Sequence, residues 1–138
     1  MADITVTAAK VGLIDPEKAV IRSYIAAETI TKGQAVYITT AGKVGVADAN
    51  AAGKQQFRGI ALNGGGAGQA IDVCHEGLLA GFTLTGNADT LLYLSDTAGA
   101  LGDGAGTMTV RAGRVVCMPD KDLTKVLRVF TQWTADWS

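Results

Sequence analysis

The feature that most constrains the fold of this chain is that its second half repeats the order of strands and turns found in its first half. The matching pairs are Tyr37 and Tyr93, 56 residues apart, Gly59 and Gly113, 54 residues apart, and Ile71 and Leu127, 56 residues apart. Each half reads as strand, turn, short strand, loop, strand, turn and strand, so an internal duplication is the economical explanation. Neither unit can bury a face of its strands alone, and we therefore expect the two to pack together as one barrel or sandwich.

The individual strands are predicted from apolar runs, alternation and turn residues. The strands are expected at residues 19–27, 35–39, 44–46, 57–62, 70–74, 91–95, 112–116 and 126–129, with a hairpin turn at 41–43 and a flexible hairpin loop at 63–68. The pattern over 19–27 is ambiguous, and its β-branched and aromatic residues favour a strand. Asp15-Pro16-Glu17 predicts at most one helical turn. Residues 47–56 fit either a short helix or a loop.

Composition agrees with a turn-rich, all-β chain. Glycine accounts for 18 of 138 residues and proline for only 2, a balance that favours many tight turns. A chain of this length is expected to fold around a single core. Charged residues are only 18%, against a typical share of about 25%, which indicates neutral surface covered by permanent partners.

Charge and hydropathy argue against two classes of partner. The formal net charge of -1, with acidic and basic residues interspersed, gives no electrostatic footprint for nucleic acid. No stretch approaches the roughly 18 apolar residues that span a bilayer, so we expect no membrane partner. The amino-terminal residues lack the basic-then-apolar pattern of a signal peptide, and we expect synthesis in a host cytoplasm.

Cys74 and His75 are the neighbours that most invite a catalytic interpretation. Successive side chains on a strand point to opposite faces, so these two cannot form the hydrogen-bonded pair that activates a thiolate. Cys74 and Cys117 lie in apolar runs and are expected to be buried and reduced. Asp96 and Asp103 flank a glycine-rich loop, but their spacing matches no known calcium loop. We expect no catalytic residue, no metal and no cofactor.

The order of several motifs resembles that of the capsid decoration, or cement, proteins of tailed phages. The motifs are Ile30–Tyr37, Gly42–Val44, Ala47–Ala49, Phe57–Leu62, Ala67–Val73, Leu92–Leu101 and Gly113–Val115. Each motif alone is generic, whereas their order and spacing from about Ala27 to Val129 are more specific. The resemblance implies an all-β, small β-barrel or tulip-like fold. It also implies a homotrimer at three-fold and quasi-three-fold points between capsomers, with the major capsid protein as partner.

The expected function is therefore structural: a non-enzymatic protein on the outer surface of a virion, which stabilises the shell against the pressure of packaged DNA. The expected organisation is an N-terminal capsid-binding arm at 1–18, a β decoration domain at 19–130 and a C-terminal tail at 131–138. The alternative is a virion-surface recognition module that binds host carbohydrate or another surface ligand, with Tyr93 near Asp96 as its faint candidate site. An enzyme is the third interpretation, and the absence of a recognisable catalytic or metal-binding motif in the sequence counts against it.

The two ends of the chain lie outside the family motifs. Alternation from Ile4 to Ala8 fits an edge strand of the barrel, or an extended arm that orders only on the capsid by adding a strand to a sheet edge. We favour the arm, with these capsid-binding residues: Ala2, Asp3, Ile4, Thr5, Val6, Thr7 and Ala8. Trp133 and Trp137 are candidates for packing back on the domain, for a subunit contact or for capsid docking.

Overall fold

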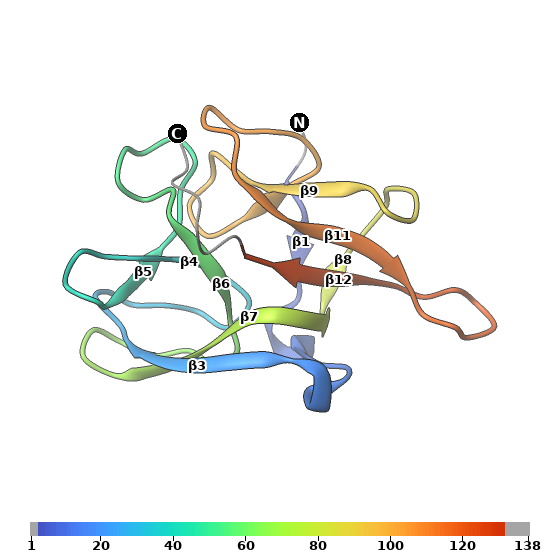
Figure 1. Cartoon of the computed structure of the whole chain (residues 1–138), viewed down its shortest axis with the longest axis horizontal. Helices are drawn as coiled ribbons and strands as arrows, with labels where there is room; N and C mark the ends of the chain where they lie inside the picture. Colours follow the sequence, from blue (N-terminus) through green and yellow to red (C-terminus); the bar gives the residue numbers. More distant parts are fainter. Residues whose placement is uncertain (1–2, 132–138) are drawn as a thin grey trace.

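A computed structural model describes residues 3–131, which fold into a curled, half-barrel antiparallel sheet (Figure 1). The strands are β1 Thr5–Val6, β2 Gly12–Leu13, β3 Val20–Ile25, β4 Ala35–Ile38, β5 Val44–Val46, β6 Phe57–Ala61, β7 Ala70–Ala80, β8 Phe82–Thr83, β9 Leu91–Leu94, β10 Leu101–Gly102, β11 Arg111–Cys117 and β12 Lys125–Phe130. Two single 3-10 turns cover Ala8–Lys10 and Pro16–Lys18. The all-β prediction is confirmed. In the described part of the chain, no helix has the length and apolar character needed to cross a membrane.

The main sheet has the strand order β10-β9-β11-β12-β7-β6-β4-β5, and this order reveals the two repeated units. In the first unit β4 pairs with β5 and β6, and β6 pairs with β7. In the second unit β9 pairs with β10 and β11, and β11 pairs with β12. The pairing of β7 with β12 joins the units into one sheet. The predicted duplication is therefore a duplication of strand pairings.

Gly59 in β6 and Gly113 in β11 hold equivalent positions in the two units. Each lies beside a register shift, opposite Val36 and Leu92 respectively. A Cβ at Gly59 would overlap the carbonyl oxygen of Cys74, and one at Gly113 would overlap that of Arg128. Both glycines therefore let the backbone of the next strand approach closely.

The register corrects one of the predicted equivalences. Ala61 pairs with Val73, and Val115 pairs with Leu127 at the matching place in the second unit. Leu127 therefore corresponds to Val73, two residues from the predicted Ile71. A shift of two residues keeps the side chain on the same face of the sheet, so the apolar pattern alone could not distinguish the two alignments.

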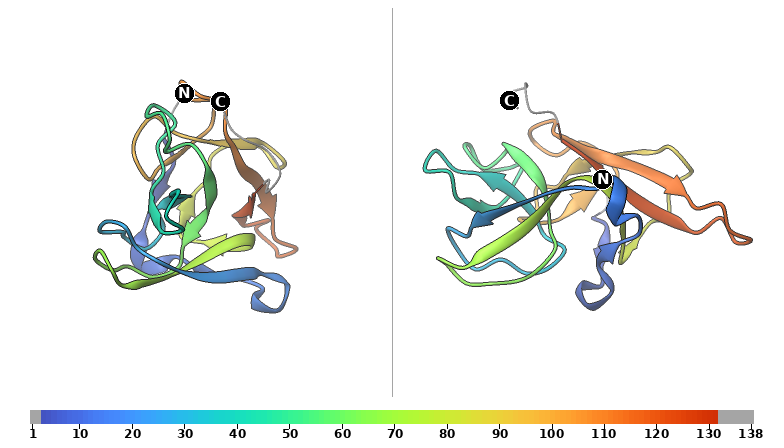
Figure 2. Two further views of the ribbon diagram at one scale, coloured as in Figure 1. Left: turned by 60° about the vertical axis from the view of Figure 1, so that its left-hand side comes forward. Right: turned by 60° about the horizontal axis from the view of Figure 1, so that its bottom comes forward.

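Strand β7 organises the molecule because it pairs along both edges. Its pairings with β6 and β12 occupy one edge, and those with β3 and β2 occupy the other. In Figure 2, β7 and β3 run side by side along the lower part of the sheet. β7 continues six residues beyond the predicted end at Cys74. The prediction stopped too early because Gly77, at φ +151°, interrupts the apolar alternation.

The core consists of two clusters on opposite faces of the β6–β7 pair. Ile60 and Cys74, which are register partners, belong to the larger cluster. The next pair, Ala61 and Val73, belongs to the smaller one. Alternate residues of a strand point to opposite faces, so both faces of this part of the sheet are covered. The larger cluster includes Phe57, Leu79, Leu94 and Leu127 and thus spans both units.

The amino-terminal segment packs against the sheet. β1 pairs with β8, and the Ile4 and Thr7 amides donate to the carbonyl oxygens of Leu101 and Gly81, each at 2.8 Å. Ile4 and Val6 pack against the larger core cluster. Residues 3–7 thus follow the edge-strand interpretation, and the expectation that this segment orders only on the capsid is corrected. The physical reason is that the chain's own core supplies the apolar surface that these side chains need.

Candidate functional site: an apolar edge strand and an arginine groove

Cys74 and His75 lie on opposite faces of β7, as the strand pattern predicted. Cys74 is fully buried, and its thiol donates to the Glu76 carbonyl oxygen across 3.3 Å. Burial raises the pKa of Cys74 to about 11. Because a thiol with this pKa stays protonated near neutral pH, Cys74 belongs to the core and is no nucleophile. Cys117 is a free thiol that is half-buried, where full burial was predicted.

His75 is buried, and both of its ring nitrogens are hydrogen-bonded. Nδ1 lies 2.5 Å from the Arg58 carbonyl oxygen, which can only accept, so Nδ1 carries the proton. Nε2 then accepts from the Tyr24 hydroxyl at 3.1 Å. Burial lowers the pKa of His75, with the charges of Arg22 and Arg58 acting in the same direction. The neutral imidazole therefore links β3 and β6 to β7 by hydrogen bonds, and its role is structural.

The aspartates considered as binding residues make hydrogen bonds within the fold. The Asp96 carboxylate accepts from the Thr107 amide at 2.7 Å and from its hydroxyl at 2.9 Å. Asp3 accepts from the Ser95 hydroxyl, and this bond is the main reason why the pKa of Asp3 is lowered. Among residues 3–131, no three His, Cys, Asp or Glu side chains gather as metal ligands. The Asp96 oxygens are thus already occupied by Thr107.

Strand β3 presents apolar side chains along an open edge. Within the described residues β3 pairs only with β7, and its other edge has no neighbouring strand until Ala26, which forms a bridge with Val44 of β5. Val20, Ile21 and Ile25 are 48%, 42% and 43% exposed. Free backbone groups beside β-branched side chains invite pairing with another chain, and proteins usually shield such edges with charges, prolines or bulges. β3 carries Arg22 and a register shift between Val20 and Ile21, yet it keeps three large apolar side chains exposed. We call β3, with these three side chains, the apolar edge.

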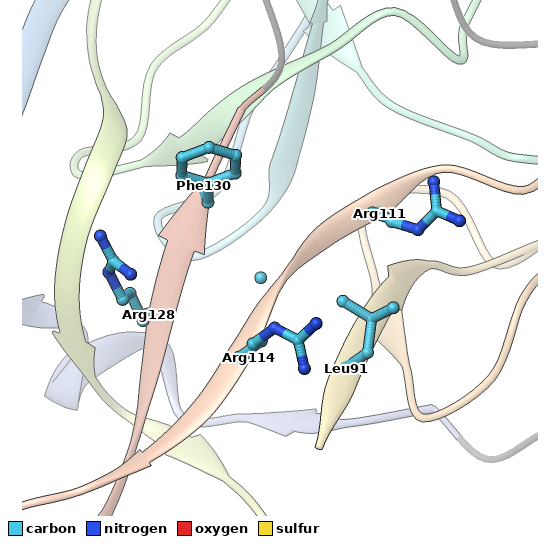
Figure 3. A pocket seen from close by; sticks show the side chains of 6 residues that line it. Leu91, Arg111, Arg114, Arg128 and Phe130 are labelled. Carbon is cyan, nitrogen blue, oxygen red and sulfur yellow. The ribbon is translucent and has the colours of Figure 1, made fainter. Parts of the chain in front are cut away.

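A groove of about 310 Å³ lies over β9, β11 and β12, and we call it the arginine groove. It is lined by Leu91, Arg111, Gly113, Arg114, Arg128 and Phe130. Figure 3 shows Arg128 and Phe130 on one side of the groove, with Leu91, Arg111 and Arg114 on the other. Arg114 and Arg128 are direct register partners in the β11–β12 pair.

The arginine groove is positively charged and has apolar walls. Arg114 Nη1 donates to the Asp89 carbonyl oxygen at 2.8 Å and lies 3.7 Å from its carboxylate, and both side chains are at least half exposed. Over residues 3–131, the guanidinium groups of Arg111 and Arg128 have neither an ion pair nor a hydrogen bond. Phe130, 43% exposed, and Leu91 supply the apolar part. The groove therefore offers guanidinium groups beside an apolar surface.

The sequence interpretation missed this groove. Arg114 falls within the motif Gly113–Val115 but was interpreted only as part of a strand, and only the strand register brings Arg114 and Arg128 opposite each other. A signal was present, since Arg114 and Arg128, two of the five arginines in the chain, fall in two successive predicted strands, and Arg111 directly precedes the first of them. Arginines at outward positions of neighbouring strands, with the intervening acidic residues Asp120 and Asp122 confined to the connecting turn, would have indicated a cationic surface.

The residues predicted for capsid binding are only partly described. Asp3, Thr5 and Thr7 are exposed, whereas Ile4 and Val6 are half-buried against the core. Ala2, Trp133 and Trp137 lie outside the described residues. A capsid-binding role for residues 2–8, and a docking role for the two tryptophans, stay predictions.

Comparisons of the chain with protein-family models, with curated proteins and with solved structures found no match.

Proposed function

We propose that this chain is a structural virion protein that binds the exterior of a phage capsid as a homotrimer. It sits at three-fold and quasi-three-fold positions, contacts the major capsid protein and holds the shell against the pressure of packaged DNA. The order of motifs between Ala27 and Val129 supports this role through its resemblance to decoration proteins. The structural observation that carries the proposal is the apolar edge, a surface suited to a permanent protein contact.

The apolar edge is the proposed contact between subunits. Contacts between permanent subunits are more apolar than ordinary protein surface, and Val20, Ile21 and Ile25 place three large apolar side chains on one strand. The free backbone groups of β3 add hydrogen-bonding capacity along the same edge. In a ring of three the contact is head-to-tail, so β3 of one subunit meets a different surface of the next.

A trimer with this geometry stabilises a shell without catalysis. Each subunit contacts one capsid subunit, and after the first contact forms, the second and third form at high effective concentration. Weak individual contacts therefore add up to tight binding. Neighbouring capsomers that share one trimer resist separation because all of its contacts would have to break together.

Multi-angle light scattering tests the assembly. The wild-type protein should have three times the chain mass of 14.2 kDa. The double variant Ile21→Asp, Ile25→Asp should be a folded monomer, because carboxylates on the apolar edge oppose its burial. The control is Leu123→Asp, which changes a side chain that is 59% exposed at a backbone φ of +49° that aspartate tolerates. It should remain a trimer.

Two outcomes of this experiment count against the proposal. A monomeric wild-type protein at micromolar concentration would remove the basis for a preassembled trimer. If both variants kept the wild-type mass, a trimer would exist but the apolar edge would not be its contact. Far-ultraviolet circular dichroism shows whether each variant keeps its strand content.

A further inference from the structure

We propose that the arginine groove is a binding site for an acidic segment of a protein partner, with carboxylates on the arginines and an apolar side chain against Phe130 and Leu91. The inference rests on the proposed function for the partner's identity, the capsid shell protein. The groove lies over β9, β11 and β12, apart from the β3 strand proposed as the subunit contact.

The arginine groove contains an unfavourable arrangement of charge. Arg114 and Arg128 are directly opposed register partners, and like charges at such positions destabilise a strand pair. Figure 3 shows the two side chains extending to opposite sides of the groove. Asp89 is the carboxylate that contacts Arg114, and Glu76 lines the neighbouring groove with Arg128 without an ion pair to it. An anion bound in the groove would offset the repulsion.

The side chains that line the groove suit a carboxylate next to an apolar group. Arginine presents a planar fork of donors that matches a carboxylate, and it binds such groups in a bidentate way that lysine cannot. The chain has seven lysines and five arginines, yet the groove contains three arginines and no lysine. Phe130 and Leu91 add apolar contact beside the donors. A carboxylate next to an apolar side chain fits both parts of the lining.

The charge of the whole chain favours a protein over a nucleic acid as the occupant of the groove. The whole chain has a formal net charge of -1 and a pI near 5.7, so beyond the groove its surface does not attract a polyanion. A volume of about 310 Å³ is at the lower end for ligand sites and accommodates a few side chains. A short acidic segment of a folded partner matches this local, limited positive charge.

Fluorescence anisotropy on the full-length protein tests the proposal directly. The probe is a labelled, capped peptide Gly-Glu-Phe-Glu-Gly, and its matched control is Gly-Gln-Phe-Gln-Gly. The Glu peptide should bind at least tenfold more tightly than the Gln peptide, since only carboxylates form charge-assisted hydrogen bonds to the arginines. Millimolar phosphate should compete only weakly, because it lacks the apolar part.

The variant Arg128→Gln distinguishes a binding role from a structural one. Removing one of two opposed charges should raise Tm by about 2 °C while weakening Glu-peptide binding by about tenfold. The control Lys54→Gln makes the same change in net charge on an exposed side chain of the 47–56 loop, away from both the groove and β3. It should leave peptide affinity within twofold and should not raise Tm.

Several results would overturn the proposal. Equal affinity for the two peptides would show that carboxylates are not recognised, and equal affinity for phosphate would define a general anion site. A change in oligomeric mass in Arg128→Gln would identify a second copy of the chain as the occupant. Capsid co-sedimentation separates the two proposals. If Arg128→Gln decorates capsids like the wild type, the groove has no role there while the decoration function stands.

Discussion

At the scale of single residues, Gly113 carries the tightest backbone approach in the second repeat, as Gly59 does in the first. The variant Gly113→Ala should lower the free energy of unfolding by about 3 kcal/mol or more, because its Cβ would overlap the Arg128 carbonyl oxygen and force β11 from β12. Gly12→Ala is the control, since nothing lies within 4 Å of its added Cβ. Urea unfolding measures both. A Gly113→Ala variant as stable as the control would contradict the register described for β11 and β12.

His75 gives the protein a pH dependence that can be assigned to one residue, because the chain has a single histidine. Its pKa is lowered in the folded state, so below the unfolded value of about 6.5 the unfolded chain binds the proton more readily. Stability should be full above pH 7 and should fall as the pH drops below 6.5 toward the lowered folded-state pKa of His75. His75→Gln should show no slope in this interval, as measured by urea unfolding at each pH. An equal slope in the variant would exclude His75 as its cause.

Residue-level expectations succeeded where they depended on strand geometry alone. Cys74 and His75 face opposite sides of β7 because adjacent residues of any strand do so, and this holds without knowledge of the partners. The opposition of Arg114 and Arg128 could not be predicted in the same way. It depends on the register between β11 and β12, and a shift of one residue would have separated the two charges.

At the scale of elements, the amino-terminal segment is part of the β domain's packing. Deleting residues 2–8 should lower the free energy of unfolding by about 2 to 4 kcal/mol, since Ile4 and Val6 leave the core and β1 leaves β8. The control is Thr5→Ala with Thr7→Ala, which alters exposed side chains and should stay within about 0.5 kcal/mol of the wild type. Urea unfolding midpoints measure both variants. An unchanged midpoint after the deletion would show that residues 2–8 do not contribute to the stability of the β domain.

Strands that pair with a sequence neighbour were predicted, whereas short strands that pair with distant segments were not. The hairpin of β4 and β5 was predicted because its turn and both strands are contiguous in sequence. β2 and β8 were missed because a strand of two residues gives no measurable periodicity. Each also pairs with a strand that is distant in sequence, β2 with β7 and β8 with β1. Residues 47–56, left open between helix and loop, form a loop with turns. The helix propensity of the alanines in this segment was too small to offset the cost of placing Gly53 in a helix.

At the scale of the whole molecule, the duplicated units share one sheet and leave two surfaces with different chemistry. The apolar edge on β3 is uncharged at Val20, Ile21 and Ile25, whereas the arginine groove lies on the strands of the second unit. This separation would allow one surface to hold subunits together while the other meets the shell. Sequence patterns predicted the duplication but not this division, because both surfaces are created by strand register and by the open edge of the half-barrel.

Cryo-electron microscopy of the encoding phage's capsids, incubated with the purified protein, tests the central claim most directly. The account predicts trimeric density on the outer surface at the three-fold and quasi-three-fold positions, with the β11–β12 face turned toward the shell. The matched sample uses the Ile21→Asp, Ile25→Asp variant, which should leave these positions weakly occupied or empty. Bare three-fold positions in the wild-type sample, or density confined to the tail or its fibres, would contradict the proposal that this protein decorates the capsid.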